Sequence, residues 1–211
     1  MEPQPLPLFP LEVVLFPAMG LPLHIFEPRY RLMIGRCLEQ SSDFGVVLAR
    51  GRRLAAVGCS ARIERIVRRH PDGRLDIWTV GMERFRILQV IEDEPYLQAW
   101  PEFFDDEEPA LEPPGQAELI ALYEKCVRLL SGARSEFSRP QPELSVSMQM
   151  AAVLPLELDF KQKLLESRSE AERQQWLRAR LWQWLPELEQ IDRARRKAGS
   201  NGRGAVLGRP Q

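Results

Sequence analysis

Residues 6–34, LPLFPLEVVLFPAMGLPLHIFEPRYRLMI, decide the fold that this sequence predicts. Two prolines bracket a run rich in β-branched residues at 11–16, which is typical of a buried strand. A glycine and a further proline then turn the chain into a second extended run at residues 21–26. Pro28 stands where the first turn of a helix tolerates a missing N–H, so we expect a helix over residues 27–40.

The rest of the first half is predicted to form short strands joined by turns. Apolar residues alternate from residue 57, and Ile66 breaks the alternation, so we expect a bulge near Glu64 and Arg65. The sequence PDG at residues 71–73 predicts a hairpin turn. The predicted strands cover residues 11–16, 21–26, 44–49, 57–67, 75–80, 84–91 and 96–104. Such short, mostly antiparallel strands close most easily as a barrel or a curled sheet.

The pattern changes after residues 105–115, DDEEPALEPPG. The consecutive carboxylates repel one another and the prolines block strand pairing, so we expect a solvated linker. The hydrophobic period then becomes about 3.6, which predicts helices at residues 117–130, 144–154 and 157–166 and a long one from Ser169. Ser169 and Glu172 form a capping box at its start. Trp182 and Trp184 lie about 200° apart on that helix, so Trp182 should be exposed.

Together these patterns predict an α+β chain with four regions. Residues 1–104 should form a β domain, 105–115 a linker, 116–197 an α-helical bundle, and 198–211 a disordered, glycine-rich tail. The 211 residues suffice for one large domain or two modest ones, and a hydrophobic content of 44% is enough for a packed core.

Composition also limits the environment and the partners. The 29 basic and 30 acidic residues nearly cancel, which argues against a surface built throughout to hold nucleic acid. The three cysteines are far apart and odd in number, which indicates reduced thiols. The N-terminus lacks the pattern of a signal peptide, and no window approaches the ~20 apolar residues of a membrane-spanning helix. We therefore expect a cytoplasmic protein with no membrane partner.

The opening stretch, with its segments FPL, VLFP, LPLHIFEPRYR and MI, resembles the start of the N-terminal domain of Lon-type proteases. Further similar segments follow in the same order, up to about residue 195. They are FGVVL at 44–48, VGCSARI at 57–63, DIWTVG at 76–81, RFRI at 84–87, KQKLLE at 161–166 and AER at 171–173. This resemblance implies a PUA-like β pseudobarrel, with about six strands and one helix, followed by a C-terminal α-helical bundle.

The resemblance also implies a function. The N-terminal domain of Lon proteases is a non-catalytic part that recognises substrates. The sequence has no GxxxxGK[ST] phosphate loop, and none of its four lysines stands in a serine–lysine peptidase context. We therefore expect a free-standing, non-enzymatic substrate-binding-domain protein without a cofactor. Its expected partners are unfolded or partner polypeptides and a protease or chaperone system.

The polypeptide-binding residues that we predict lie in the proline-rich opening. Prolines at strand edges leave carbonyl groups and ring surfaces that can receive an extended peptide. The candidates are Phe16, Pro17, Met19, Leu21 and Phe26. For each of them the alternative interpretation is that it fills the core.

The alternative function is RNA binding through the PUA-like barrel and the arginine-rich residues 50–74. Arginines neutralise phosphates, and the candidates are Arg52, Arg53, Arg68 and Arg69. No aromatic stacking platform is interleaved with these arginines, which weakens the hypothesis. Nucleic acid is therefore the less favoured partner.

Other site chemistry has little support in the sequence. His24 and His70 are the two histidines, and no CxxC or HExxH spacing accompanies them, so we expect no metal site and read His24 as a packing residue. A small hydrolase or ligand-binding barrel that uses His24 or Cys59 is a third hypothesis. Nothing in the sequence marks a cysteine as activated, so no catalytic residue is predicted.

Overall fold

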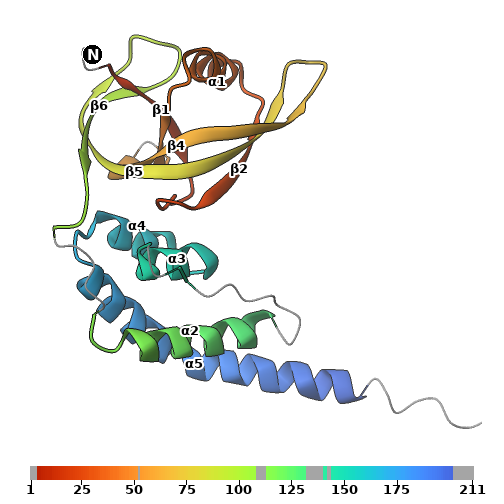
Figure 1. Ribbon diagram of the computed structural model, residues 1–211. Coiled ribbons are helices and arrows are strands. Elements are labelled where there is room, and N and C mark those ends of the chain that lie inside the picture. The colour runs from red at the N-terminus through yellow and green to blue at the C-terminus, as the bar shows by residue number, and fades with distance from the viewer. Residues whose placement is uncertain (1–3, 52, 108–112, 132–139, 142–143, 202–211) are drawn as a thin grey trace, which may run out of the picture.

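The computed structural model describes residues 4–51, 53–107, 113–131, 140–141 and 144–201, and the side chains up to residue 197. In Figure 1 the strands form the upper part of the molecule and most of the helices form the lower part. Helix α1 (Pro28–Gln40) lies on the far side of the strands from the other helices. The predicted linker region, 105–115, falls between the last strand and the first helix of the lower part, and as a domain boundary it stays a prediction.

The described strands form one six-stranded sheet in the order β2-β5-β4-β3-β1-β6. Their bounds are β1 (Leu6–Leu11), β2 (Gly20–Ile25), β3 (Phe44–Arg50), β4 (Arg53–Arg69), β5 (Leu75–Ile91) and β6 (Gln98–Phe104). β5 pairs with β6 as well as with β4, so the pairings of β5, β4, β3, β1 and β6 form a closed ring, to which β2 is added at β5. The β1–β3 pairing is parallel and the others are antiparallel.

The prediction of separate strands at residues 75–80 and 84–91 was wrong, because β5 runs through both. Its first part pairs with β2 and its second part pairs with β6. Gly81 lies at the change of partner, where its N–H donates to the carbonyl of Met19 and its carbonyl accepts from Ala18. A Cβ atom on Gly81 would lie 2.2 Å from the carbonyl oxygen of Phe16, so a glycine is required for this close approach.

The prediction of a strand at residues 11–16 was also wrong, since the first strand is β1, five residues earlier. Pro10 is tolerated in β1 because the pairing of β1 with β6 ends before this residue. The N–H of Leu8 donates to Leu97 beside β6, and alternation turns the nitrogen of Pro10 toward the same side. The β6 ladder covers only Leu6 and Pro7 of β1, so Pro10 removes no ladder hydrogen bond.

The bulge that we predicted near Glu64 and Arg65 is confirmed. The pairing of β4 with β5 shifts between Ile63 and Arg65, and it shifts again between Ile66 and Arg68. Each shift skips one residue of β4. The strand therefore keeps its isoleucines on the core side although the arginines recur every third residue.

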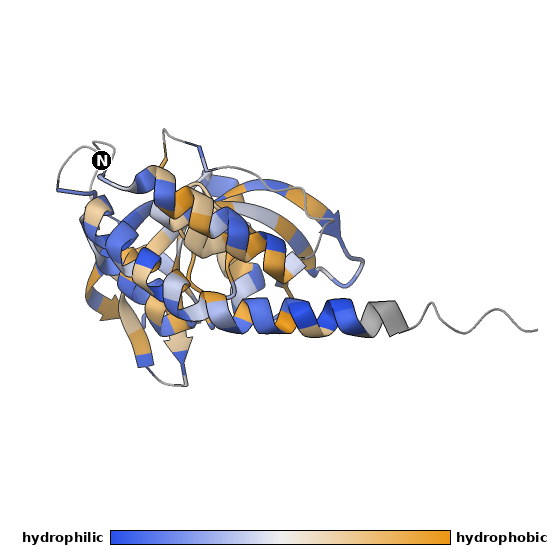
Figure 2. Cartoon of the chain, turned by 90° about the horizontal axis from the view of Figure 1, so that it is seen from below, coloured by the Kyte–Doolittle hydropathy of each residue, from blue (hydrophilic) through white to orange (hydrophobic). Residues whose placement is uncertain are grey.

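The helical part consists of α2 (Gln116–Ser131), α3 (Val146–Val153), α4 (Leu158–Glu166) and α5 (Glu170–Asn201), each close to its predicted bounds. Ser169 caps α5 as predicted, its hydroxyl accepting from the N–H of Glu172 at 3.3 Å. Trp182 is 60% exposed, which confirms its prediction. Figure 1 shows α2 beside α5, and in Figure 2 the long helix α5 extends beyond the rest of the molecule at its C-terminal part. The predicted disordered tail lies outside the described residues from 202 onward, while residues 198–201 continue α5.

The two parts share hydrophobic core. Val14, Phe16, Leu48 and Val57 of the first half belong to the same buried cluster as the inner faces of the four lower helices. A separate cluster lies between α1 and the strands, where Phe9, Tyr30 and Phe44 meet edge to face. No helix in the described ranges has the length and apolar composition that crossing a membrane would require.

A buried ionic cluster joins the parts at Asp106. The guanidinium of Arg84 on β5 donates to Asp106 at 2.5 Å and to the carbonyl of Ser167 at 2.6 Å. Arg173 on α5, fully buried, donates to both oxygens of Asp106 and also to Glu170 at 2.7 Å. The prediction that this carboxylate run is simply solvated was therefore wrong at Asp106. Its partners lie 22 residues earlier and 67 residues later, so local sequence could not identify them.

We expect Asp106→Asn to lower the free energy of unfolding by about 3 kcal/mol or more, because it leaves two buried arginines short of a counter-charge. The matched control is Asp105→Asn, whose residue is exposed and whose effect should stay within about 0.5 kcal/mol. Urea denaturation of the three proteins measures both values. Equal effects of the two substitutions would contradict the assigned role of Asp106.

The same cluster predicts a pH dependence of stability. Burial works to raise the pKa of Asp106, but the hydrogen bonds and charges of Arg173 and Arg84 lower it below its ordinary value of 3.8. A carboxyl whose pKa is depressed by folding stabilises the protein above its unfolded pKa, and this contribution is lost as the pH falls through the folded pKa. The free energy of unfolding should therefore fall on acidification below about pH 5, with a shallower slope in Asp106→Asn. Identical slopes from pH titration of denaturation midpoints would contradict this assignment.

Candidate functional site

β2 presents an open strand edge. In the described part of the chain it pairs with β5 and with no other strand. Met19 accepts a hydrogen bond from β5 just before β2, so alternation turns the backbone groups of Gly20, Pro22 and His24 to the opposite, unpaired edge. Pro22 has no N–H group, and on an unpaired edge this removes no hydrogen bond of the ladder. Strands tolerate proline at such positions. This edge could accept hydrogen bonds from an added extended chain.

A groove lies along this edge, between the end of β1 and β2. It has a volume of about 280 Å³ and is lined by residues 9–11, 22–27, 29 and 30. The lining is mainly apolar, and the charged exceptions Arg29 and Glu27 pair with each other at 2.8 Å. A second hollow of about 760 Å³ shares Pro10, Leu11, Arg29 and Tyr30 with the groove, so the two adjoin. Their combined lining suits an extended segment with apolar side chains.

The polypeptide-binding residues predicted from the sequence do not form one surface. Phe16 is 1% exposed and packs among the helices, so it makes no surface contact in this conformation. Pro17, Met19 and Leu21 are half-buried, and none of the three lines the groove. Phe26 is 58% exposed and does line it. Sequence reasoning missed Leu23 and the buried Phe9 and Tyr30, because only the folded chain brings β1, β2 and α1 together.

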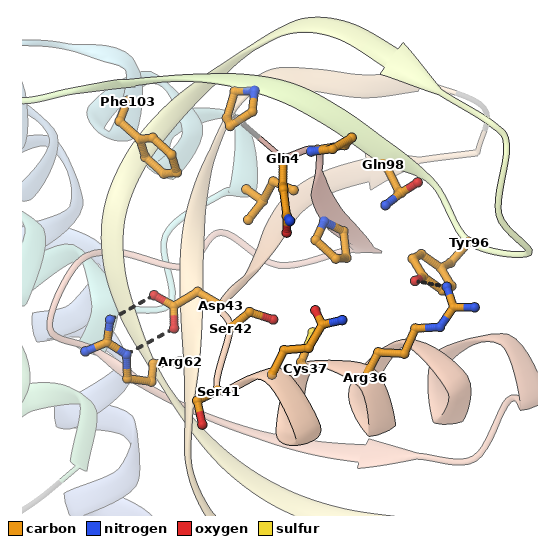
Figure 3. A pocket seen from close by; sticks show the side chains of 15 residues that line it. Gln4, Arg36, Cys37, Ser41, Ser42, Asp43, Arg62, Tyr96, Gln98 and Phe103 are labelled. Atoms are coloured by element: carbon orange, nitrogen blue, oxygen red, sulfur yellow. Dashed lines mark hydrogen bonds and ion pairs between the residues drawn. The ribbon is translucent and has the colours of Figure 1, made fainter. Parts of the chain in front are cut away.

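A separate pocket of about 440 Å³ lies between α1, the N-terminal segment and β6. Figure 3 shows Arg62 facing Asp43 and Arg36 facing Tyr96 across this pocket. Arg62 donates to both oxygens of Asp43 at 3.0 Å, and Arg36 donates to Tyr96 at 2.9 Å. Burial raises the pKa of the Cys37 thiol in this pocket. A buried thiol whose pKa is raised is not an activated nucleophile.

The hypothesis of a hydrolase that uses Cys59 or His24 gains no support from the structure. Cys59 is fully buried, and desolvation raises its pKa to about 12, so the thiolate is scarce at neutral pH. The interpretation of His24 as a packing residue was wrong. Its side chain is 45% exposed on the outer face of β2, where it contacts Asp76.

The arginines of the alternative RNA hypothesis are dispersed. Arg53, Arg68 and Arg69 are exposed, and Arg52 lies outside the described residues. Other arginines of this region pair with acidic or aromatic side chains. These pairs are Arg50 with Asp159, Arg62 with Asp43, Arg74 with Asp72, and Arg65 with the ring of Trp78. The described contacts therefore leave the RNA hypothesis without structural support.

Comparison with known proteins finds similarity to one part of Lon proteases. Residues 5–177 match the family model described as the ATP-dependent protease La (LON) substrate-binding domain. The Lon protease of Cytophaga hutchinsonii is 27% identical, and the match covers 83% of this chain and 24% of that protein. Lon protease 2 of Herpetosiphon aurantiacus is 30% identical, with 87% of this chain and 24% of that protein covered. The chain thus spans about a quarter of the length of the curated relatives that it matches.

Solved structures share the fold. The crystal structure of a Lon N-terminal domain protein from Xanthomonas campestris superimposes with a TM-score of 0.68 at 27% identity, covering 83% of this chain and 98% of that one. The N-terminal domain of the Mycobacterium avium complex Lon protease has a TM-score of 0.60 at 18% identity, covering 82% of this chain and 96% of that one. The second comparison supports the fold alone.

Phe16 is buried and Phe26 is exposed, so replacing each of them with alanine should change the stability by different amounts. Phe16→Ala should lower the free energy of unfolding by about 3–5 kcal/mol, because it leaves a cavity in the core shared by strands and helices. Phe26→Ala should change it by less than about 0.5 kcal/mol, because the ring is mostly exposed. Chemical denaturation distinguishes these values. A loss in Phe26→Ala as large as that in Phe16→Ala would show that the ring is not at the surface.

Proposed function

Because the chain belongs to the family of Lon (ATP-dependent protease La) substrate-binding domains, we propose that it is a polypeptide-recognition module that binds unfolded or partner protein at the open edge of β2. The relatives with this domain are named Lon proteases, which supports a link to proteolysis. A protease or chaperone system is the partner that this proposal assigns to the chain.

The observation that carries the proposal is the unpaired edge of β2 beside an apolar groove. Main-chain hydrogen bonds at a strand edge bind any extended sequence, and side-chain hollows beside the edge add preference. Here Leu23 and Tyr30 form part of the wall, and Phe26 stands exposed at the rim. A site of this type suits the recognition of many unfolded chains, since affinity comes mainly from backbone groups that every polypeptide has.

We also infer that the closed ring of strand pairings is a PUA-like pseudobarrel and that the module is non-catalytic and cytoplasmic. The pairing of β5 with both β4 and β6 supports the first inference. A family match to a substrate-binding domain, together with buried thiols whose pKa values are raised, supports the second. The unpaired sulfur atoms of all three cysteines agree with a reducing compartment.

The test is binding of a labelled, carboxymethylated model polypeptide that cannot fold, followed by fluorescence anisotropy. Phe26→Ala should weaken binding about fivefold or more, as expected for loss of an exposed aromatic anchor. Phe103→Ala removes another exposed phenylalanine, which lines the pocket of Figure 3 and not the groove, and should leave the affinity unchanged. Trp182→Ala on α5 is a second control of equal exposure.

Two results would overturn the proposal. One is the absence of saturable binding at about 50 µM protein, which corresponds to an affinity too weak for recognition. The other is weakening by Phe103→Ala without weakening by Phe26→Ala, which would move the binding site to the pocket of Figure 3.

A further inference from the structure

Three side chains with metal-ligating atoms meet on the outer face of β2 and β5, and one of them, His24, has its backbone on the unpaired edge described above. His24 Nδ1 lies 2.5 Å from Asp76 Oδ1, and His70 Nε2 lies 2.8 Å from Asp76 Oδ2. The three ligand atoms are all within 4.8 Å of one another. The two imidazole rings meet edge to face with centroids 5.7 Å apart. The arrangement therefore gathers two imidazole nitrogens and one carboxylate at a single point.

The sheet holds these side chains in place. The pairing register puts His24 of β2 directly opposite Asp76 of β5. His70 follows β4 in the hairpin turn, where its N–H donates to the carbonyl of Arg74 at 2.9 Å and its carbonyl accepts from Gly73 at 3.0 Å. The backbone positions of the three ligands are thus fixed by strand pairing and by a closed turn. Such support is what a preorganised metal site needs.

We propose that His24, His70 and Asp76 bind a divalent transition metal ion of the zinc class. Two histidines and one carboxylate form a donor set that Zn²⁺ uses with a fourth position left open. Zinc–ligand bonds of about 2.0–2.1 Å put neighbouring ligand atoms about 3.3 Å apart. The carboxylate must therefore move outward by somewhat less than about 1 Å, and the imidazole nitrogens must approach.

The surroundings permit these movements. His24 and Asp76 are 45% and 33% exposed, so small side-chain rotations meet no packed core. Phe26 stacks on the His24 ring at 5.9 Å and restricts its orientation. Arg68 lies opposite Asp76 in the register and is a nearby cation, but its side chain is exposed and can turn away. The site does not depend on the polypeptide-binding proposal, although His24 also lines the groove.

The experiment uses the full chain, stripped with a chelator, and titrates it with ZnCl₂ by calorimetry. We expect one ion per chain. His24→Ala, His70→Ala and Asp76→Asn should each weaken binding about tenfold or more, since even the loss of a ligand's supporting partner costs about 10–100-fold. Asp159→Asn, which removes an exposed carboxylate paired with Arg50, is the matched control and should bind as the parent does. Circular dichroism confirms that each variant is folded.

Cobalt substitution separates this site from other sources of binding. Co²⁺ should give visible ligand-field absorption of a low-symmetry site without a thiolate charge-transfer band, and this absorption should vanish in His70→Ala. Three results would overturn the proposal: no zinc binding, binding that the three ligand variants leave unchanged, or a thiolate band. Equal binding of Mg²⁺ would overturn it too, because that ion prefers oxygen ligands and would indicate simple charge attraction.

Discussion

The carboxylate of Asp106 binds two buried guanidinium groups, and the relative position of the strands and the helices depends on it. Arg84 belongs to β5 and Arg173 to α5, so one side chain between the last strand and the first helix of the lower part fixes both. Two buried cations are costly unless each finds acceptors. The carbonyl of Ser167 and the carboxylate of Glu170 provide the others. The strands and the helices also share a hydrophobic core that contains Phe16.

The second constraint is that β5 pairs with three strands, whereas a strand inside a sheet usually pairs with two. It pairs with β4 along one edge, and it divides the other edge between β2 and β6. Because β6 closes the ring, β2 is left outside it, and among the described strands only β5 pairs with β2. The close approach at Gly81 permits this change of partner. The candidate groove, the exposed Phe26 and the pairing of His24 with Asp76 all follow from the position of β2.

Local patterns predicted the helices well and the strands less well. Helical periodicity and a capping serine are properties of neighbouring residues, so the helices within the described residues were predicted close to their observed bounds. The strand at residues 11–16 was placed too late, because whether a proline disturbs a strand depends on which edge is paired. The linker was judged by its own charges, and the two arginines that pair with Asp106 lie far away in sequence. Among the predicted polypeptide-binding residues, Phe26 lines the groove, while burial removes Phe16 from any surface.

The sequence by itself determined the family, the positions of the helices, and the bulge in β4, because these follow from motifs and periodicities within short windows. The tertiary structure decided which residues share a site. Register places His24 against Asp76 across 52 residues, and ring closure leaves the edge of β2 open. Such pairings are set by the free energy of the whole packed chain. No local sequence pattern predicts the contact of two residues that are distant in sequence.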